Sequence, residues 1–364
     1  MVFQTGRGTL VQVRRIRAIG MLPVATIAGF GLVAGVALAG CSSFPVRSGA
    51  SAPASASPTG DTASPSHLTP TSTRSDTPTP EPPPAPTIDT NLAPPKVDGV
   101  TWQPVGTPVG GHPAAYLSEA DGGQIALMWM DPKLLGFRFI PGYEVPGSGP
   151  RTAADKDPNT WVPNMVAAFN GGFQLSDGAG GYYYLGETVK EMQDGLGTVV
   201  IYKDGTMKVG SYGRDVTVGP DVVAVRQNLQ PLIDNGQSQA SPDDSSRRWG
   251  IADKGSSYAK RSAVGQLADG SIVFGYGSGI TASQLADAMV AVGVQQAVAL
   301  DMNISWPTGY YYTREGGEVV GHRIQPDIVR EPDTYLDSFK KDFFVAESRV
   351  PLSPGAASPT PSKS

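Results

Sequence analysis

Two tight turns between apolar runs constrain the fold of this chain most strongly. Asp204-Gly205 separates residues 198–203 from 206–209, and Asp269-Gly270 separates 261–267 from 271–276. An Asp-Gly pair between two such runs is a strong short-range signal for a β-hairpin, because glycine accepts the positive φ that a two-residue turn needs. We therefore predict two antiparallel hairpins, over 198–209 and 261–276.

A third hairpin and a helix are predicted nearby. Residues 124–131 read as a buried strand, and 136–140 as its partner returning after the Asp131-Pro132 turn. Either Thr281 or Ser283 is a suitable N-cap for a helix that ends at Gly293. Its apolar face recurs at helical spacing, at Leu285, Ala288, Met289 and Val292.

Polar residues end two apolar strands. Residues 296–300 lead directly to Asp301, and residues 166–169 lead to Asn170 after an expected helix over 159–165. Ligands in α/β sheets bind at the ends of such strands. We therefore expect Asn170 and Asp301 to lie side by side.

These elements indicate one α+β domain over 97–350, with a β-rich mixed sheet, hairpins and a few packing helices. A chain of roughly 250 residues is long enough for one sizeable core. Residues 42–96 and 351–364 are rich in Pro, Ser, Thr and Ala. They lack apolar periodicity, so we predict a disordered tether before the domain and a disordered tail after it.

The first 41 residues have the order of an export signal. Basic residues precede an apolar stretch over 21–39, and Leu38-Ala39-Gly40 leads to Cys41. This ending resembles the bacterial lipobox, which predicts cleavage before Cys41 and lipidation of its thiol. The alternative is a transmembrane anchor with an incidental cysteine. The lipoprotein reading places the domain at the extracellular face of the cell membrane.

Composition excludes several classes of site. Cys41 is the only cysteine and the chain has three histidines, of which His67 lies in the predicted tether. Disulfides, thiol catalysis and three-histidine metal sites in the domain are thereby excluded. No metal-binding spacing occurs, and we predict neither a metal nor a cofactor. The net charge of −5, without a basic stripe, argues against a nucleic-acid partner.

The run Asn170-Gly171-Gly172-Phe173 is the most informative short motif. Adjacent glycines permit positive φ and a close approach of a ligand to the backbone, and an asparagine amide both donates and accepts hydrogen bonds. A sugar or phosphate contact is one interpretation. A tight turn without a ligand is the other.

The order of these motifs resembles the phosphodiester glycosidase family, the uncovering-enzyme-like domain. The matching segments are 170–173, then 261–265 opening with Arg261, then 283–286, and then Leu300-Asp301-Met302-Asn303-Ile304-Ser305. Members of that family carry three glycines where this chain has residues 302–304. We expect these larger side chains to reshape the floor of the site.

The resemblance implies cleavage of a sugar–phosphate diester at the anomeric carbon. It implies that Arg261 pairs with the phosphate and that Asp301 acts as nucleophile, general base or sugar ligand. Asn170 completes the predicted catalytic set, and Glu187 is the first choice for a second carboxylate, ahead of Asp177. The predicted substrate-binding residues are Gly171, Gly172, Phe173, Ser305 and Trp306.

The sequence thus predicts an exported, lipid-anchored hydrolase of sugar-1-phosphodiester or related glycan linkages. Its partners would be a cell-envelope glycan or sugar-phosphate polymer, and the membrane through lipidated Cys41. Whether the chain is an enzyme stays open at this point. One alternative is a non-catalytic glycan-binding lipoprotein of the same fold, and another is a structural envelope protein.

Overall fold

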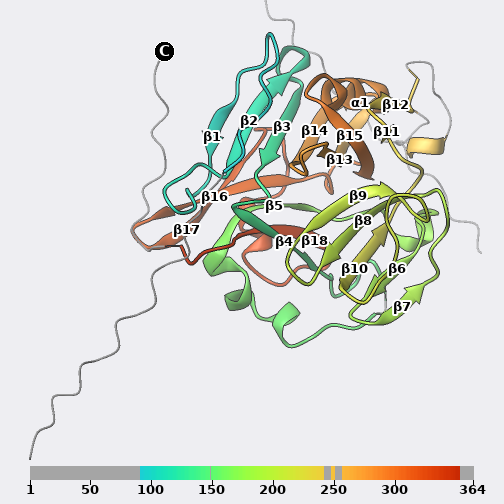
Figure 1. Cartoon of the computed structure of the whole chain (residues 1–364), viewed down its shortest axis with the longest axis horizontal. Helices are drawn as coiled ribbons and strands as arrows, with labels where there is room; N and C mark the ends of the chain where they lie inside the picture. Colours follow the sequence, from blue (N-terminus) through green and yellow to red (C-terminus); the bar gives the residue numbers. More distant parts are fainter. Residues whose placement is uncertain (1–90, 148, 242–246, 251–255, 353–364) are drawn as a thin grey trace, which may run out of the picture. The chain divides into compact units, whose positions relative to one another are not determined.

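Antiparallel strands are the main regular secondary structure in the described part of the protein, as its computed structural model shows (Figure 1). The structure describes residues 91–147, 149–241, 247–250 and 256–352. The pairings between the named strands of this part are all antiparallel. The predicted β-rich α+β class is confirmed, and the sheets are antiparallel rather than mixed.

The described strands form three sheets. An eight-stranded sheet has the order β1 (Gln103–Val105), β2 (Ala115–Ala120), β3 (Ile125–Met130), β14 (Ile272–Ile280), β13 (Ala259–Leu267), β15 (Val294–Asp301), β11 (Ile233–Asp234) and β12 (Gln237–Ser238). A five-stranded sheet has the order β7 (Glu187–Lys190), β6 (Tyr182–Tyr184), β10 (Val222–Gln227), β8 (Gly197–Tyr202) and β9 (Met207–Ser211). The second five-stranded sheet has the order β17 (Glu318–Arg323), β16 (Gly309–Glu315), β5 (Met165–Asn170), β18 (Phe343–Ser348) and β4 (Leu135–Ile140).

The predicted helix is present as α1 (Ala282–Ala291) and contacts β13, β14 and β15. Thr281 is the N-cap and forms a capping box with Gln284, which satisfies two free amides at the helix start. Gly293 has φ 90° and follows the helix, as predicted. Short 3-10 turns make up the remaining described helical segments: Asp121–Gly123, Ala154–Lys156, Pro158–Thr160, Val162–Asn164, Leu175–Asp177, Arg247–Trp249 and Pro332–Tyr335.

The sheet that contains β5 packs against both of the others. Phe169 of β5 stacks on Phe274 of the eight-stranded sheet, with ring centroids 4.8 Å apart. Phe139 of β4 packs on Tyr182 and Tyr184 of the other five-stranded sheet, at 5.8 Å each. These aromatic contacts bury large apolar areas and fix how the sheets face one another.

Both Asp-Gly hairpins are confirmed. β8 pairs with β9, and β13 pairs with β14. Gly205 and Gly270 have φ of 79° and 91°, the conformation for which glycine was expected at these turns.

The hairpin predicted across Asp131-Pro132 is wrong. β3 and β4 both form, but β3 pairs with β2 and β14, while β4 pairs with β18 in another sheet. The Asp131 side chain accepts hydrogen bonds from the amides of Lys133 and Leu92, which fixes a sharp change of direction instead of a return turn.

The helix predicted over 159–165 is also wrong. Two 3-10 turns occupy Pro158–Thr160 and Val162–Asn164, and Met165 already belongs to β5. Pro163 lacks an amide donor, so an α-helix running through 159–165 would lose a backbone hydrogen bond at this position.

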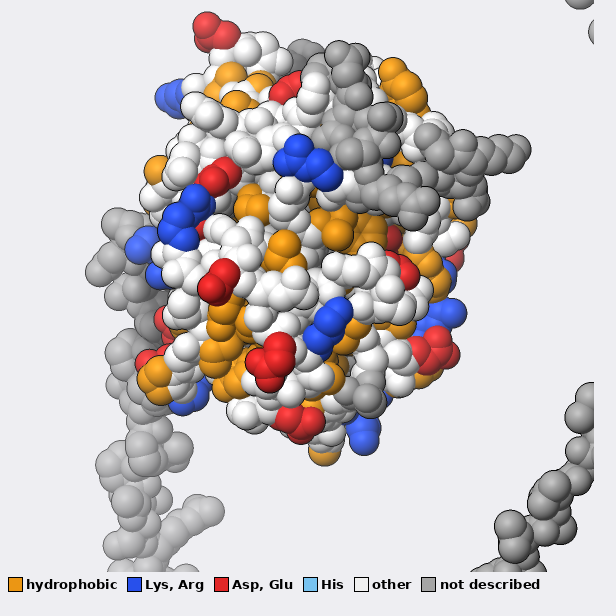
Figure 2. Space-filling view, turned by 90° about the vertical axis from the view of Figure 1, so that its right-hand side faces the viewer, with side chains coloured by type: hydrophobic (Ala, Val, Ile, Leu, Met, Phe, Trp, Pro, Cys, Tyr) orange, Lys and Arg blue, Asp and Glu red, His pale blue; other side chains and the backbone are white. Residues whose placement is uncertain are grey.

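The molecular surface carries mixed charge. On the face in Figure 2, basic and acidic side chains are interspersed, with hydrophobic side chains between them. Among the described residues, no helix has both the length and the apolar character to cross a membrane.

Candidate active site

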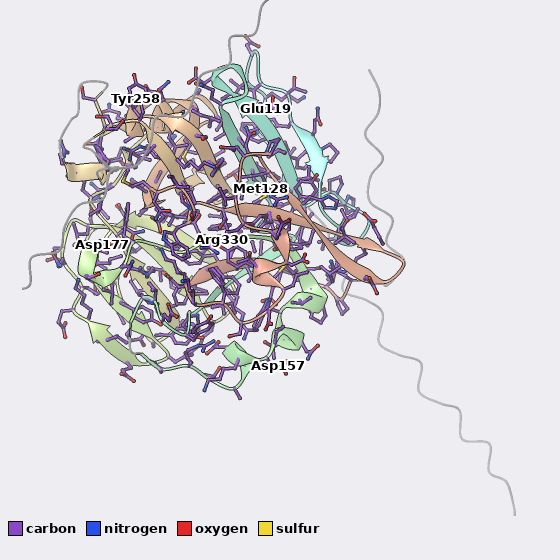
Figure 3. The ribbon with its side chains drawn as sticks, turned by 180° about the vertical axis from the view of Figure 1, so that it is seen from behind. Glu119, Met128, Asp157, Asp177, Tyr258 and Arg330 are labelled. Carbon is purple, nitrogen blue, oxygen red and sulfur yellow. The ribbon has the colours of Figure 1, made fainter. Side chains whose placement is uncertain are left out.

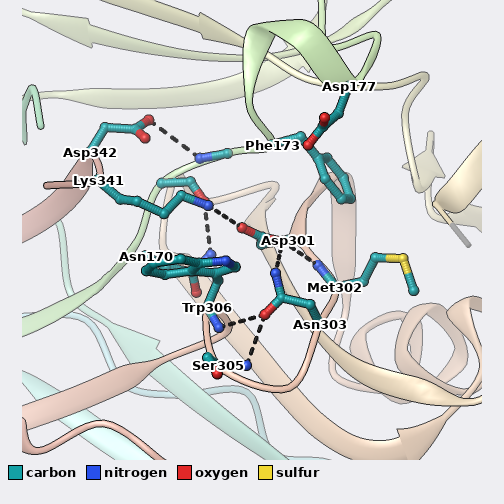
Figure 4. A network of polar contacts seen from close by, with 12 residues as sticks. Asn170, Phe173, Asp177, Asp301, Met302, Asn303, Ser305, Trp306, Lys341 and Asp342 are labelled. Atoms are coloured by element: carbon teal, nitrogen blue, oxygen red, sulfur yellow. Dashed lines mark hydrogen bonds and ion pairs between the residues drawn. The ribbon is translucent and has the colours of Figure 1, made fainter. Parts of the chain in front are cut away.

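Asp301 is the last residue of β15, and its carboxylate lies in a buried polar network (Figure 4). Its Oδ2 accepts a hydrogen bond from Lys341 Nζ at 2.6 Å, and its Oδ1 accepts one from the Met302 amide at 2.7 Å. Asn303 Nδ2 donates a longer bond of 3.5 Å to the same Oδ1. Only 4% of Asp301 is exposed, so these donors fix the orientation of the carboxylate.

Opposing effects act on the pKa of this carboxyl. Burial raises the pKa of Asp301, and the Lys341 ammonium and the Met302 amide act against that rise. The group therefore resembles a general base more than an ordinary surface aspartate does, because its affinity for a proton is increased.

Lys341 and Asp342 stand directly before β18, at the end of β5. Asp342 is fully buried, and its Oδ2 accepts a bond from Arg226 Nε at 2.9 Å. Its backbone oxygen accepts from the Gly171 amide at 2.9 Å. The end of β5 is therefore hydrogen-bonded to Asp342, the neighbour of the Lys341 that pairs with Asp301.

Packing explains why residues 171 and 172 are glycines. Neither Gly171 nor Gly172 has positive φ. A Cβ on Gly171 would lie 2.3 Å from Asp342 Oδ2, and one on Gly172 would lie 2.3 Å from Asn228 Oδ1. The close approach that the glycines permit is thus made by the protein's own side chains.

Asn170 connects the end of β5 to the loop that follows Asp301. Its Oδ1 accepts a bond from the Thr308 amide at 3.0 Å, and its Nδ2 donates to Gly171 O at 2.8 Å. Asn170 and Asp301 belong to different sheets, yet both ends meet at Lys341-Asp342, so the expected proximity of the two strand ends is realised across sheets (Figure 4).

The loop over 303–306 is ordered by a side chain of its own. Asn303 Oδ1 accepts bonds from the amides of Ser305 and Trp306, both at 2.8 Å. The Trp306 ring lies against Lys341, whose Nζ is 4.7 Å from the ring centroid. Ser305 and Trp306 are therefore held beside the Asp301–Lys341 pair.

A cavity of about 370 Å³ adjoins this network. It is lined by Phe173, Asp177, Leu229, Gly250, Asp301, Met302 and Asn303. Of the three large residues in place of the family's glycines, Met302 packs with Phe173 in the cavity wall, whereas Ile304 is 70% exposed. Met302 and Asn303 thus both line the cavity, whereas Ile304 does not.

Arg261 lies behind this cavity rather than in it. Its guanidinium donates to the backbone oxygens of Trp249, Ser257 and Ile280. Burial lowers its pKa to about 10. It fixes Trp249, the neighbour of cavity residue Gly250, so its contacts support the wall.

The candidates for a second carboxylate lie in different places. Glu187 is exposed at the start of β7, an edge strand, and does not line the cavity. Asp177 is exposed but does line it, beside Phe173 (Figure 4). The geometry therefore favours Asp177 over Glu187 as an acidic group facing a bound molecule.

Several residues of this network had no signal in the sequence. Lys341 and Asp342 follow another lysine in a stretch that resembles a solvated charge run, and Arg226 and Asn228 end an ordinary strand. Their buried positions, all below 10% exposure, follow only from the packing of three sheets.

In the described part of the chain, no group of three or more His, Cys, Asp or Glu side chains is placed to hold a metal ion. Cys41, the predicted lipidation site, lies outside the described residues, as do the predicted signal peptide and the tail from residue 353.

Part of the chain matches the model of a known protein family. Residues 163–302 match the family model of the phosphodiester glycosidases, which confirms the resemblance seen in the motifs. This segment runs from the turn before β5 to the residue after Asp301. No curated protein sequence matches the chain significantly.

Three solved structures are similar to this chain. The zebrafish N-acetylglucosamine-1-phosphodiester α-N-acetylglucosaminidase catalytic domain, auto-inhibited by its pro-peptide, has a TM-score of 0.41 and 16% identity over 69% of this chain and 88% of that one. A hypothetical protein from Synechocystis has a TM-score of 0.34 and 12% identity, over 71% of this chain and 64% of that one. A putative exported protein from Burkholderia pseudomallei has a TM-score of 0.24 and 11% identity, over 68% and 58%. With TM-scores this low, these structures add nothing to the family match.

Proposed function

We propose that this chain, whose residues 163–302 match the phosphodiester glycosidase family, hydrolyses a sugar-1-phosphate diester at the cavity beside Asp301. The family match supports a glycosidase-type function. The observation that carries the finer proposal is the buried Asp301–Lys341 pair, with a 2.6 Å contact, at the border of that cavity.

Hydrolysis would break the bond between the anomeric carbon and the phosphate oxygen. The electron pair of that bond stays with the phosphate monoester, which is already a good leaving group and needs no strong general acid. Asp301 would stabilise the positive charge that develops on the sugar and accept a proton from the attacking water. The Lys341 ammonium favours the ionised form of this carboxylate, against the effect of burial.

Asp177 and Phe173 would contact the sugar from the other wall of the cavity. A carboxylate accepts hydrogen bonds from sugar hydroxyls, and an aromatic ring covers an apolar sugar face. Gly171 and Gly172 would contribute indirectly, by admitting the Asp342 and Asn228 side chains that shape the turn.

The location of the substrate is proposed from sequence alone. The lipobox-like ending at Cys41 and the Pro/Ser/Thr-rich residues 42–96 support export, lipid anchoring and a spacer at the extracellular face of the membrane. A glycan or sugar-phosphate polymer of the cell envelope would then be within reach of the domain.

A chromogenic sugar-1-phosphodiester tests this function. We expect the wild-type chain to release sugar and Asp301→Asn to lower kcat/KM by about two orders of magnitude or more, the usual contribution of a general base. Asp287→Asn, an exposed change on α1, is the matched control and should leave the rate unchanged. Since burial raises the pKa of Asp301, activity should fall with decreasing pH sooner than it would for an ordinary aspartate.

Absence of release over a panel of sugar-1-phosphodiesters, from a chain shown to be folded, would refute the hydrolase. Glycan binding that persists in Asp301→Asn without any release would instead support a binding module. The Met302 side chain in the cavity wall is the feature that favours this second function.

A further inference from the structure

Three cationic side chains lie around the ring of Trp306. The centroid of the ring lies 4.2 Å from Arg330 Cζ, 4.7 Å from Lys341 Nζ and 5.0 Å from Lys340 Nζ. All three charges therefore lie within about one Debye length of one another, roughly 10 Å at 0.1 M salt. Like charges so close together repel, and an anion between them would relieve that repulsion.

The carboxylates nearby do not balance these charges. Lys341 is paired with Asp301, and Lys340 reaches Glu144 only at 4.0 Å, where both side chains are more than one-third exposed. Within the described residues, Arg330 has no carboxylate at ion-pair distance. Its Nη1 and Nη2 groups donate no hydrogen bond to any of those residues.

Arg330 is nevertheless fixed in position. Its Nε donates to Ser305 O at 3.0 Å, and its guanidinium lies beside the rings of Trp306 and Phe339, with Cζ 5.3 Å from the centroid of the Phe339 ring. Arg330 lies near the middle of the view in Figure 3 and is half-buried. A guanidinium held by its Nε and by contacts with two rings presents its two terminal nitrogens as a fork, the geometry that binds phosphate oxygens in pairs.

This cation group is coupled to Asp301 through the 303–306 loop. Asn303 contacts Asp301 with its Nδ2, and its Oδ1 holds the amides of Ser305 and Trp306. Ser305 in turn accepts from Arg330. The positions of the cations and of the carboxylate are thus set by one short segment.

We propose that Arg330 and Lys340, arranged on Trp306, form the site for the phosphate group of the substrate. The location of the sugar relative to this site rests on the function proposed above, whereas the anion site itself does not. Arg330 would bind two phosphate oxygens through Nη1 and Nη2, and Lys340 would supply a second positive charge. Trp306 then serves as the platform of the cations instead of a stacking surface for sugar.

Binding of inorganic phosphate to the full chain tests the site without any hydrolysis. By isothermal titration, we expect Arg330→Gln and Lys340→Gln each to weaken phosphate affinity about tenfold or more, as for the loss of a charge-assisted hydrogen bond. Lys203→Gln removes the same charge from an exposed pair with Asp221 in another sheet and should bind as the wild type does. Unchanged affinity in both site variants would overturn the proposal.

The variant Arg330→Lys distinguishes a loss of phosphate binding from a loss of folding stability. It retains the charge but loses both the fork and the bond to Ser305, so we expect an affinity between those of the wild type and Arg330→Gln. If Arg330→Lys and Arg330→Gln lose all affinity together with an equal fall in Tm, Arg330 is merely structural and the proposal fails.

The same variants distinguish this proposal from the proposed function. Phosphate binding that depends on Arg330, with no sugar released from any diester, would leave the anion site standing and refute the hydrolase. Hydrolysis with an unchanged KM in Arg330→Gln and Lys340→Gln would refute the assignment of this site to the phosphate of the substrate and leave the hydrolase standing.

Discussion

At the level of single residues, the turn after β5 is determined by two side chains that reach it from distant parts of the chain. Asn228 Oδ1 accepts a bond from the Phe173 amide at 3.0 Å, and Asp342 Oδ2 contacts the Gly172 amide at 3.4 Å. Both contacts need the space that a side chain at 171 or 172 would fill. Phe173 is thereby placed in the cavity wall.

We expect Gly172→Ala to lower the free energy of unfolding by about 1–3 kcal/mol, the usual cost of overpacking. The new Cβ would lie 2.3 Å from Asn228 Oδ1, so the bond to Phe173 must break or the turn must move. Gly219→Ala is the matched control, because its Cβ would meet no atom within 4 Å and its φ is not positive. Urea unfolding measures both variants, and equal stabilities would contradict this explanation of the motif.

At the level of elements, β18 directly follows two residues of the site and itself carries a half-buried acid, Glu347. It lies between β5 and β4 and begins directly after Lys341 and Asp342. Near its other end, burial raises the pKa of Glu347 to about 7, and the Arg138 guanidinium on β4 acts against that rise. The folded protein therefore binds a proton at Glu347 more tightly than the unfolded chain does.

This difference gives a prediction for stability against pH. A raised folded-state pKa contributes stability that is present below the ordinary value of 4.5 and is lost as the pH rises through about 7. Glu347→Gln removes that dependence, so the stability of the variant relative to the wild type should increase between pH 5 and pH 8. Urea unfolding at both pH values checks this, with the exposed Glu318→Gln as control. If the difference in unfolding free energy between Glu347→Gln and the wild type is the same at pH 5 and pH 8, the prediction is wrong.

At the level of the whole molecule, two consecutive residues connect the three sheets. Lys341 binds Asp301 of the eight-stranded sheet, while Asp342 binds Arg226 in the sheet of β10, and both residues directly precede β18 of the third sheet. The candidate site thus lies where the sheets meet, and its geometry depends on all of them.

We expect Arg226→Met to destabilise the protein by about 3–5 kcal/mol, because it leaves the Asp342 carboxylate buried without its cation. Arg226 and Asp342 are 1% and 0% exposed. Arg214→Met, which breaks exposed pairs with Asp215 and Asp234, should cost at most about 1 kcal/mol. Thermal and urea unfolding compare the two, and similar losses would show that the buried pair does not hold the sheets together.

Features that depend on near neighbours in the chain could be predicted from the amino-acid sequence. The hairpins over 198–209 and 261–276, the capped helix before β15 and the end of β15 at Asp301 follow from turn, cap and apolar patterns within a few residues. The family resemblance rested on the same local motifs. It is confirmed for 163–302.

Strand pairing and the contacts between distant charges depend on the packing of the folded chain and could not be predicted in this way. The partner of β4 is β18, although β3 is its neighbour in sequence, and the cation of Asp301 lies 40 residues away at Lys341. Arg226 and Asp342 are 116 residues apart. Contacts of this kind leave no periodicity in the chain, because their energy comes from burial and desolvation that exist only once the sheets have packed.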